Sequence, residues 1–355
     1  MKIGNLDLGK KLFLAPMAEV TDSSFRKICK EHGAGLTFTQ MVSALGVIKN
    51  EFETLRYLSF NRAEKPIGVQ VLGNDPEILG EAVKEIAKFK PDLIDLNCGC
   101  PVDKVVSNKM GAALIDDPKR IGKIVRKMVD SSGGIPISVK TRLGKDKSRI
   151  NILEVARTVE ENGGSLIFIH IRTRVDKYDS NVDSSWLKKV KDNINIPVVG
   201  NGSLFTPQDI KKMLEETACD SAMIARGALG NPFLFERFNT LIETGEDPGE
   251  PYIGIVRDVL LKQIKFLEEN YGEPACIDKV KKHTVWYFKN YPGIELLIDS
   301  IFSFTNLNSI RQFIGEHTDK ILNNVYTVAS NFQINKKFKK KVLFWLEEDY
   351  VENLG

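Results

Sequence analysis

The sequence predicts a closed (β/α)8 barrel of parallel strands, followed by a small domain built only of helices. From the start to about residue 235, short apolar segments alternate with longer amphipathic segments, and eight such apolar segments occur. Strands that alternate with helices pair in parallel, and eight of them favour a closed barrel. A doubly wound open sheet is the alternative, but its glycine-rich nucleotide-binding turn is missing after the first predicted strand. Beyond about residue 252 the apolar spacing is purely helical.

Each barrel strand is predicted from a short apolar run that ends in a turn. These runs are residues 12–15, 36–41, 66–72, 93–96, 135–140, 166–170, 196–200 and 222–225. The first helix is predicted to begin at a cap formed by Thr21 or Asp22, because Phe25, Ile28 and Cys29 then recur at helical spacing. Every strand except the last is followed by enough chain for a helix.

The boundary between the two domains is predicted within residues 242–252, where the composition shifts to Gly, Pro and acidic residues. We therefore expect a catalytic barrel at residues 1–241 and a helical domain at residues 242–355. The helical domain carries a basic segment at residues 334–350 and further basic residues, namely Lys279, Lys281, Lys282, His283, Lys289 and Arg311.

Composition sets limits on the class of protein. The chain has 355 residues, a mass of 39.9 kDa and a formal net charge of +3, which permits an anionic partner without requiring one. Five cysteines without a C-x-x-C pair predict neither a disulfide framework nor a zinc ribbon. The N-terminus lacks the apolar region of a signal peptide, and no apolar run approaches the roughly 18 residues of a membrane span. We expect a cytoplasmic monomer with no membrane association.

Barrel enzymes place their active sites at the carboxyl ends of the strands. Here those ends gather cationic and amide side chains and a thiol, without a pair of carboxylates or a cluster of metal ligands. Glycosidase and metal-dependent hydrolase chemistry is therefore disfavoured, and no metal site is predicted.

The end of the fourth strand is the strongest candidate for a catalytic centre. Asn97, Cys98, Gly99, Cys100 and Pro101 follow the apolar run directly, and polar residues 102–113 then predict a loop that moves over the site. Cys98 is interpreted as packing, because free cysteine is often buried. Cys100 lies at the mouth of the predicted loop, where its thiol could act as a nucleophile or as a proton donor.

The last two strand ends predict a phosphate site. GNGS at residues 200–203 and ARGALGNP at 225–232 bring backbone N–H groups and Arg226 into the loops where barrels bind phosphate. A phosphorylated cofactor or substrate is therefore expected. Lys140, at the end of the fifth strand, suits an ammonium that stabilises an electron-rich ring or an anion. His170 fits either a core position or a functional one.

Eight segments, in the same order along the chain, resemble the tRNA-dihydrouridine synthases. They are APMAEVTDSSFR at 15–26, VQVLG at 69–73, LNCGCP at 96–101, VKTRLG at 139–144, HIRTR at 170–174, NGS at 201–203, ARGALGNPFLF at 225–235 and KVKKHTVWYFKNYPG at 279–293. The resemblance extends over residues 12–300 and is specific as a combination. The tail from about residue 305 is not part of it.

The resemblance implies a barrel that binds FMN, which NADPH or NADH reduces, and a tRNA uridine that receives hydride at C6 and a proton at C5. It implies that Cys100 is the proton donor. The implied FMN-binding residues are Pro16, Met17, Ala18, Gln70, Lys140, His170, Asn201, Gly202, Ser203, Ala225 and Arg226. The implied substrate-binding residues are Asn97, Lys104, Arg142 and Arg172. A uridine within folded RNA must be extruded to reach the flavin, and the basic helical domain would bind the RNA backbone.

Two positions depart from the family pattern, because Ile171 and Ala225 stand where relatives often have glycine. Two other functions are compatible with parts of the sequence. A flavin enzyme resembling the dihydroorotate dehydrogenases would act on a free pyrimidine and would not need a basic helical domain. A non-catalytic RNA-binding barrel would not need the combination of Cys100, Lys140 and Arg226.

Overall fold

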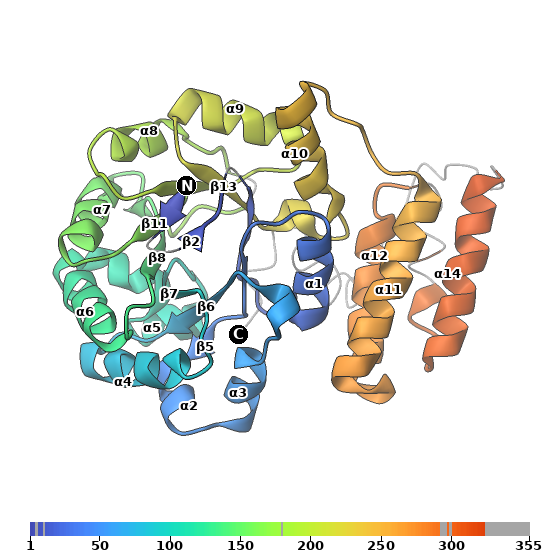
Figure 1. Ribbon diagram of the computed structural model, residues 1–355, viewed down its shortest axis with the longest axis horizontal. Helices are drawn as coiled ribbons and strands as arrows, with labels where there is room; N and C mark the ends of the chain where they lie inside the picture. Colours follow the sequence, from blue (N-terminus) through green and yellow to red (C-terminus); the bar gives the residue numbers. More distant parts are fainter. Residues whose placement is uncertain (4–5, 10, 179, 292–296, 298–299, 324–355) are drawn as a thin grey trace.

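The computed structural model describes residues 1–323 apart from residues 4–5, 10, 179, 292–296 and 298–299. Within this part, eight parallel strands form a barrel with helices around it, as Figure 1 shows. The barrel strands are β3 (Phe13–Leu14), β4 (Thr37–Phe38), β6 (Ile67–Leu72), β7 (Leu93–Cys98), β8 (Ile137–Arg142), β11 (Leu166–His170), β12 (Val198–Asn201) and β13 (Ser221–Ile224). The predicted fold is confirmed.

The strands follow one another around the barrel in chain order. The hydrogen-bonded sequence of strands is β3-β13-β12-β11-β8-β7-β6-β4, and a parallel bridge between Phe13 and Leu36 joins the two ends. The short strand β5 (Val42–Ser43) also pairs with β6. Because parallel neighbours end on the same side, all eight carboxyl ends meet at one face of the barrel.

Helices cover the outside of the barrel and bury one apolar face each. They are α1 (Ser23–Glu31), α2 (Ala44–Ile48), α3 (Phe52–Leu58), α4 (Pro76–Ala87), α6 (Pro118–Ser131), α7 (Ile152–Glu161), α8 (Ser185–Lys191), α9 (Pro207–Thr217) and α10 (Phe233–Thr244). Asp22 caps α1 by accepting a hydrogen bond from the backbone N–H of Phe25, as the sequence predicts. The last strand is also followed by a helix, α10, where none was predicted from the sequence.

Two small hairpins extend the barrel at its opposite ends. At the amino-terminal end, β1 (Lys2–Ile3) and β2 (Leu6–Asp7) bring Ile3 and Leu8 against the barrel residues Phe13 and Phe168. After strand β8, β9 (Gly144–Asp146) and β10 (Arg149–Ile150) form the second hairpin. The first hairpin therefore covers the amino-terminal end of the barrel. A cavity in the barrel can open only at the carboxyl-end face.

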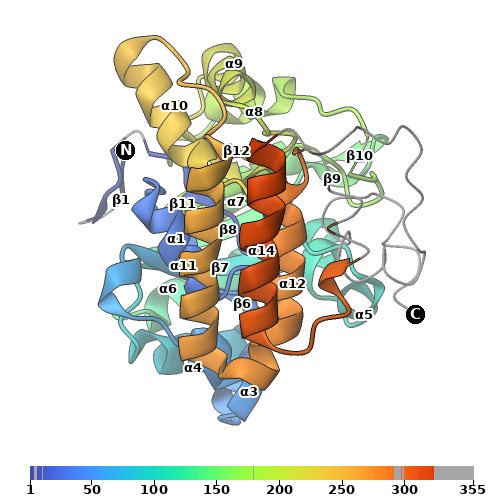
Figure 2. The ribbon, with the colours of Figure 1, turned by 90° about the vertical axis from the view of Figure 1, so that its right-hand side faces the viewer.

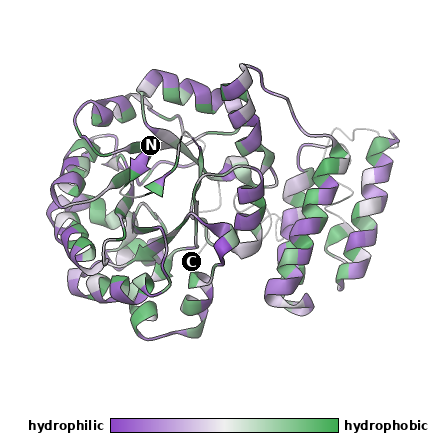
Figure 3. Cartoon of the chain, in the orientation of Figure 1, coloured by the Kyte–Doolittle hydropathy of each residue, from purple (hydrophilic) through white to green (hydrophobic). Residues whose placement is uncertain are grey.

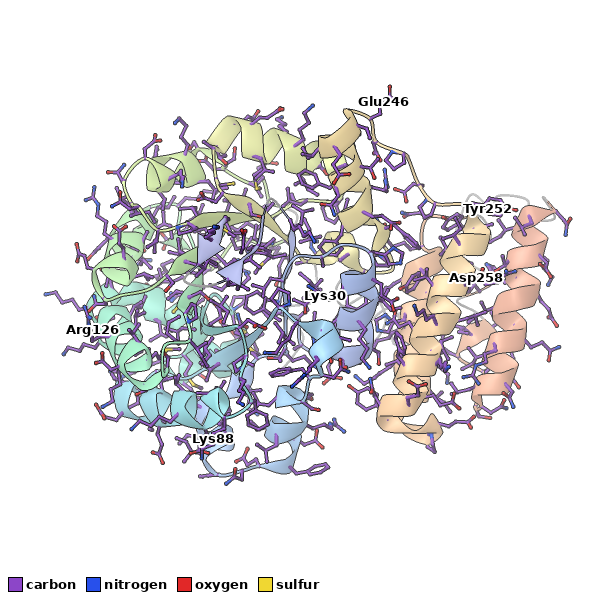
Figure 4. The ribbon with its side chains drawn as sticks, in the orientation of Figure 1. Lys30, Lys88, Arg126, Glu246, Tyr252 and Asp258 are labelled. Atoms are coloured by element: carbon purple, nitrogen blue, oxygen red, sulfur yellow. The ribbon has the colours of Figure 1, made fainter. Side chains whose placement is uncertain are left out.

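Beyond the barrel, α11 (Ile253–Tyr271), α12 (Glu273–Phe288) and α14 (Leu307–Leu322) pack side by side (Figure 2). Hydrophobic stripes along α11 and α14 in Figure 3 correspond to a second core that includes Leu260, Ile264, Ile310 and Ile314. The connection from the barrel runs from Gly245 to Tyr252, and Figure 4 marks it by Glu246 and Tyr252. The basic segment predicted at 334–350 lies entirely outside the described residues.

Helix α12 is the element that joins the helical region to the barrel. Its Trp286 belongs to the hydrophobic core of the barrel. A Cβ atom on Gly230 would lie 2.1 Å from the backbone of Trp286, so glycine is required for this close approach. Lys289 donates a hydrogen bond from Nζ to the carbonyl oxygen of Leu229 at 2.7 Å. The two parts therefore share an interface built from apolar packing and backbone contacts.

Three basic residues of α12, Lys279, Lys282 and His283, face this interface, and RNA contact by the basic residues of this helix stays a prediction. Lys279 lies 3.5 Å from a carboxylate oxygen of Glu19 and 3.7 Å from one of Asp22. Lys281 and His283 are buried, and Lys282 donates a hydrogen bond to the carbonyl oxygen of Glu19. The reason is geometric, since a helix packed on both sides turns most of its side chains inward. In the same way Arg311 of α14 pairs with Glu268 of α11 at 2.5 Å.

None of the described helices combines the length and apolar character that a membrane crossing needs.

Candidate active site

A deep pocket opens at the carboxyl-end face of the barrel. It is lined by residues from all eight strand ends and the loops that follow them: Ala15, Pro16, Met17, Ala18, Met41, Gln70, Asn97, Gly99, Cys100, Pro101, Val102, Asp103, Lys140, Arg142, His170, Arg172, Tyr178, Asn201, Gly202, Ser203, Leu204, Phe205, Ala225, Arg226 and Gly227. Every predicted site residue except Lys104 lines this pocket. Lys104 is exposed on α5 (Asp103–Ser107), next to the lining residue Asp103. The barrel topology thus brings together residues that are far apart in the sequence.

Cys100 is held at the pocket wall by contacts to its backbone. Its N–H donates to Oδ1 of Asn97 at 2.9 Å, and its carbonyl oxygen accepts from the N–H of Ala112 at 2.9 Å. Burial raises the pKa of the Cys100 thiol, although Arg142 and Lys140 partly oppose this effect. The thiol is therefore protonated at neutral pH, which suits a proton donor better than a nucleophile. Cys98, two residues earlier, is fully buried in the barrel core.

The segment at residues 102–113 is largely helical, which corrects the prediction of a loop. It contains α5 and the start of the 3-10 helix η2 (Gly111–Asp116), whose Ala112 and Leu114 are buried. Gly111 has φ of 58°, and a Cβ there would lie 2.8 Å from the carbonyl oxygen of Cys100. The polar residues that suggested a loop occupy the outer face of these short helices, while the inner face packs under Cys100.

Cationic side chains dominate the charge of the pocket. Lys140, Arg142, Arg172 and Arg226 line it, and Asp103 is the single acidic residue among its described lining residues. Burial, followed by the proximity of Arg142, lowers the pKa of Lys140 to about 8. Such a lining favours an anionic ligand, because the ligand would offset the mutual repulsion of these cations.

The cations and neighbouring main-chain groups hold one another in place. Arg142 donates from Nε to the carbonyl oxygen of Gly99 at 2.9 Å and from Nη1 to that of Thr173 at 2.8 Å. Lys140 Nζ lies 3.3 Å from Oδ1 of Asn201, a residue whose amide donates to the carbonyl oxygen of Met223 at 2.7 Å. These contacts fix the positive charges in the pocket before any ligand binds.

His170 is a neutral imidazole in this environment. Burial, followed by the charges of Arg142 and Lys140, lowers its pKa well below the usual range. Its Nε2 atom lies 3.4 Å from Nη1 of Arg172, which can only donate a hydrogen bond. Nε2 is therefore the acceptor and Nδ1 carries the proton. The sequence left His170 as either a core residue or a functional residue. In the structure it is both, because it is buried and forms part of the pocket wall.

The two turns predicted to bind phosphate lie against each other. A Cβ on Gly227 would lie 2.1 Å from the carbonyl oxygen of Leu204, so only glycine allows this approach. Gly202 has φ of 138° and Ser203 has φ of 51°, both in the region that favours glycine. Arg172 donates to the Ser203 hydroxyl at 2.9 Å. The turns after β12 and β13 thus form one wall of the pocket, next to Arg226.

Three aromatic or thioether residues of the pocket were missed by the sequence analysis, namely Met41, Tyr178 and Phe205. The Tyr178 ring is stacked on His170 with centroids 6.1 Å apart, and the Arg226 guanidinium lies 4.9 Å from it. The Phe205 ring centroid lies 5.4 Å from the same guanidinium. Tyr178 comes from the long connection between β11 and α8, and Phe205 from the short turn between β12 and α9. Neither segment has an apolar periodicity that would single these residues out. Of the two positions that depart from the family pattern, Ile171 packs in the core and Ala225 lines the pocket.

The described residues contain no group of three or more His, Cys, Asp or Glu side chains placed to hold a metal ion. The arrangement offers instead one protonated thiol, amide groups and fixed positive charges. It can therefore bind an anionic or carbonyl-rich ligand and transfer one proton to it.

Comparison with known proteins places the chain in a family. A family model described as dihydrouridine synthase (Dus) matches residues 13–323. The tRNA-dihydrouridine synthase B of Pasteurella multocida is 35% identical over 289 residues, which cover 81% of this chain and 87% of that protein. A probable tRNA-dihydrouridine synthase of Rickettsia bellii is 34% identical over 294 residues, covering 82% of this chain and 90% of that protein.

Solved structures agree on the fold. Histamine dehydrogenase from Rhizobium sp. 4-9 superposes with a TM-score of 0.54 at 16% identity, over 75% of this chain and 50% of that chain. At this identity the likeness concerns the barrel alone. The match to the family model extends from the first barrel strand into the helical region. This chain belongs to the dihydrouridine synthase family.

Proposed function

We propose that this protein reduces uridine in tRNA to 5,6-dihydrouridine, with FMN as its bound cofactor and NADPH or NADH as its electron donor. The observation that carries the proposal is the protonated Cys100 thiol at the wall of a cation-lined pocket in a barrel of this family. The relatives named as tRNA-dihydrouridine synthases support the choice of substrate. Family membership also makes an enzyme resembling the dihydroorotate dehydrogenases the weaker alternative.

The residues present fit FMN. The turns after β12 and β13 would hold its phosphate through Asn201, Gly202, Ser203, Ala225 and Arg226, because they join backbone turns to a fixed positive charge. Pro16, Met17 and Ala18 give an apolar wall, and Gln70, Lys140 and His170 give polar groups for its ring system. Lys140 is suited to stabilise negative charge on the ring, since burial holds its ammonium in a low-dielectric site.

The chemistry is divided between cofactor and protein. When bound and reduced, FMN supplies the hydride that C6 of uracil receives. Cys100 gives its thiol proton to C5, and the resulting thiolate takes a proton from solvent. The C5=C6 double bond thus gains two electrons and two hydrogens, while NADPH or NADH is oxidised. Asn97, Arg142 and Arg172 would bind the uracil carbonyls, and Lys104 on the exposed face of α5 would meet the RNA backbone.

The direct test is a reconstituted reaction. Full-length protein would be purified, its flavin identified by absorbance and mass, and then incubated with NADPH or NADH and an unmodified tRNA transcript. We expect bound FMN and dihydrouridine in the digested tRNA. A colourless protein that does not take up FMN would refute the flavin proposal. A yellow protein that reduces a free pyrimidine and leaves tRNA unchanged would refute the tRNA substrate.

Arg226→Ala is expected to weaken FMN binding by about 10–100-fold, since a charge-assisted hydrogen bond contributes roughly 1.5–3 kcal/mol. The measurement is a titration of flavin-free protein with FMN, followed by flavin fluorescence. Riboflavin, which lacks the phosphate, should bind wild type and Arg226→Ala equally. Arg149→Ala is the control, because Arg149 is an exposed arginine that pairs with Asp146 on the β9–β10 hairpin. Equal loss of riboflavin affinity would contradict a phosphate contact.

The rate of reduction is expected to fall as pH rises past about 8, the pKa to which Lys140 is lowered. Below this pH the ammonium is protonated and stabilises negative charge on the ring; above it the charge is lost. The Cys100 pKa is raised above its usual value, so the thiol keeps its proton to higher pH. A profile of kcat/KM for tRNA against pH checks this. In Lys140→Met the decline near pH 8 should vanish while the decline at higher pH remains.

A further inference from the structure

A continuous chain of hydrogen bonds runs beneath the pocket and ends at Cys100. Asp95, on β7, is fully buried and does not line the pocket. Its Oδ1 accepts from the Ser138 hydroxyl at 2.6 Å, and its Oδ2 accepts from Nε2 of Gln70 at 2.7 Å. Oε1 of Gln70 accepts from Nδ2 of Asn97 at 2.8 Å. Oδ1 of Asn97 accepts from the backbone N–H of Cys100 at 2.9 Å and from that of Gly99 at 3.0 Å.

The chemistry of its two ends fixes the direction of every bond in this chain. An ionised carboxylate can only accept, so the end of Gln70 that faces Asp95 must be its NH₂ group. The oxygen of Gln70 must then face Asn97, which meets it with its own NH₂ group. The remaining oxygen of Asn97 faces the backbone donors of Gly99 and Cys100. The buried carboxylate at one end and the backbone N–H groups at the other therefore agree on which atoms both pocket amides present.

Burial of this carboxylate has a cost that its partners only partly offset. Desolvation raises the pKa of Asp95 to about 6, although the hydrogen bonds from Gln70 and Ser138 and the charge of Lys140 oppose the shift. An apolar residue would pack at this position without that cost. The acid at position 95 is therefore better explained by its effect on neighbouring side chains than by packing in the barrel core.

We infer that Asp95 is a positioning residue, which holds the Asn97–Cys100 turn in its active geometry by acting through Gln70 and Asn97. Asp95 touches neither solvent nor the pocket, so it is not itself catalytic. Without its acceptor the Gln70 amide is free to rotate, and the Asn97 oxygen is no longer held toward the N–H of Cys100. The turn would then open more often and expose the thiol, which is partly buried in the intact protein. The consequence for uridine reduction rests on the proposed function; the consequence for the thiol does not.

The test measures the rate at which iodoacetamide alkylates Cys100 in the purified full-length protein at pH 7, by mass spectrometry of the Cys100 peptide. Cys98 lies two residues from Cys100 and is fully buried, so its alkylation would report global unfolding of the protein. Asp95→Leu removes the acceptor. Asp95→Asn keeps it, because its oxygen can face Gln70 while its NH₂ group donates to the Ser138 hydroxyl. Gln70→Met breaks the chain in the middle, and Ser138→Ala removes the partner on the side away from Cys100.

We expect Asp95→Leu and Gln70→Met to accelerate alkylation of Cys100 about fivefold, the effect of one lost hydrogen bond on the opening of the turn. Asp95→Asn and Ser138→Ala should match wild type, and Cys98 should stay unmodified throughout. Combining Asp95→Leu with Asn97→Ala should add nothing to the effect of Asn97→Ala alone, since both act on the same hydrogen bonds. Uridine reduction, where it is measured, should slow while alkylation accelerates.

Three results would overturn the inference. One is an unchanged Cys100 rate in both Asp95→Leu and Gln70→Met. Another is an Asp95→Asn variant as fast as Asp95→Leu, which would assign the effect to the charge of Asp95 and not to its acceptor. The third is additivity of Asp95→Leu with Asn97→Ala. If Asp95→Leu alone fails to fold, as alkylation of Cys98 would reveal, Gln70→Met and Asp95→Asn decide the question. Because no substrate or added cofactor takes part, this outcome is independent of whether tRNA is the substrate.

Discussion

Cys100→Ala is expected to lower the rate of uridine reduction by about 10²–10⁴-fold, the usual contribution of a general acid. The thiol is the neutral proton donor at the pocket wall, whereas Lys140 and the pocket arginines are charged groups held by other contacts. Alanine removes the proton donor and leaves the backbone hydrogen bonds of residue 100 in place. The measurement is single-turnover formation of dihydrouridine by reduced enzyme on an unmodified tRNA transcript.

Cys98→Ala is the matched control for this prediction. Cys98 lies two residues away, fully buried in the barrel core, and has no contact with the pocket. Its replacement should cost some stability and leave the chemical rate close to that of wild type. FMN content should be the same in both variants. A Cys100→Ala enzyme with an unimpaired single-turnover rate would show that the proton reaches C5 by another route.

Arg26→Met is expected to destabilise the barrel by about 3–5 kcal/mol, the cost of leaving a buried charge without its partner. Arg26 and Glu64 are both buried and form an ion pair at 2.6 Å. Arg26 also donates to the carbonyl oxygens of Thr21 and Ser59, and Glu64 accepts from the Ser23 hydroxyl. This network fixes α1 against the segment that leads into β6. Urea denaturation followed by circular dichroism measures the loss.

A second variant separates loss of charge pairing from loss of packing. In Arg26→Met combined with Glu64→Leu no charge is left buried, so much of the lost stability should return. Arg149→Ala, which breaks an exposed pair with Asp146, should change stability by less than about 1 kcal/mol. If the double variant is as unstable as Arg26→Met, the lost stability comes from the packing of the two side chains, and the pairing of their charges contributes little.

The barrel was predictable because each strand leaves a local signal in the sequence and this signal repeats along the chain. Each strand shows as an apolar run, and Asp22 begins α1 through a capping bond that the sequence already implies. Strand ends were less certain: the fifth strand begins and ends two residues later than expected, at Ile137 and Arg142. Strand ends depend on pairing with neighbours, which a single segment does not encode. The pocket followed from topology, since parallel strands deliver their carboxyl ends to one face.

The errors have a common physical origin in contacts between distant segments. Nothing in the sequence of α12 assigns its basic residues a partner within the chain, but Lys279 meets Glu19 and Asp22 of the barrel. The segment after Pro101 looked like a loop because it is rich in polar residues and closes on Gly111, yet its apolar residues pack beneath Cys100. Asp95 looked like an interruption in an apolar strand. Its role depends on Gln70, 25 residues away in the sequence.

The proposed function requires that this chain makes dihydrouridine in tRNA and that Cys100 supplies the proton. The most direct measurement maps dihydrouridine, position by position, in tRNA from cells lacking the gene and complemented with wild type, Cys98→Ala or Cys100→Ala. We predict that the deletion loses dihydrouridine at one or more positions, that wild type and Cys98→Ala restore it, and that Cys100→Ala does not. Unchanged dihydrouridine at every position in the deletion strain, with no second enzyme of this family present, would contradict the account.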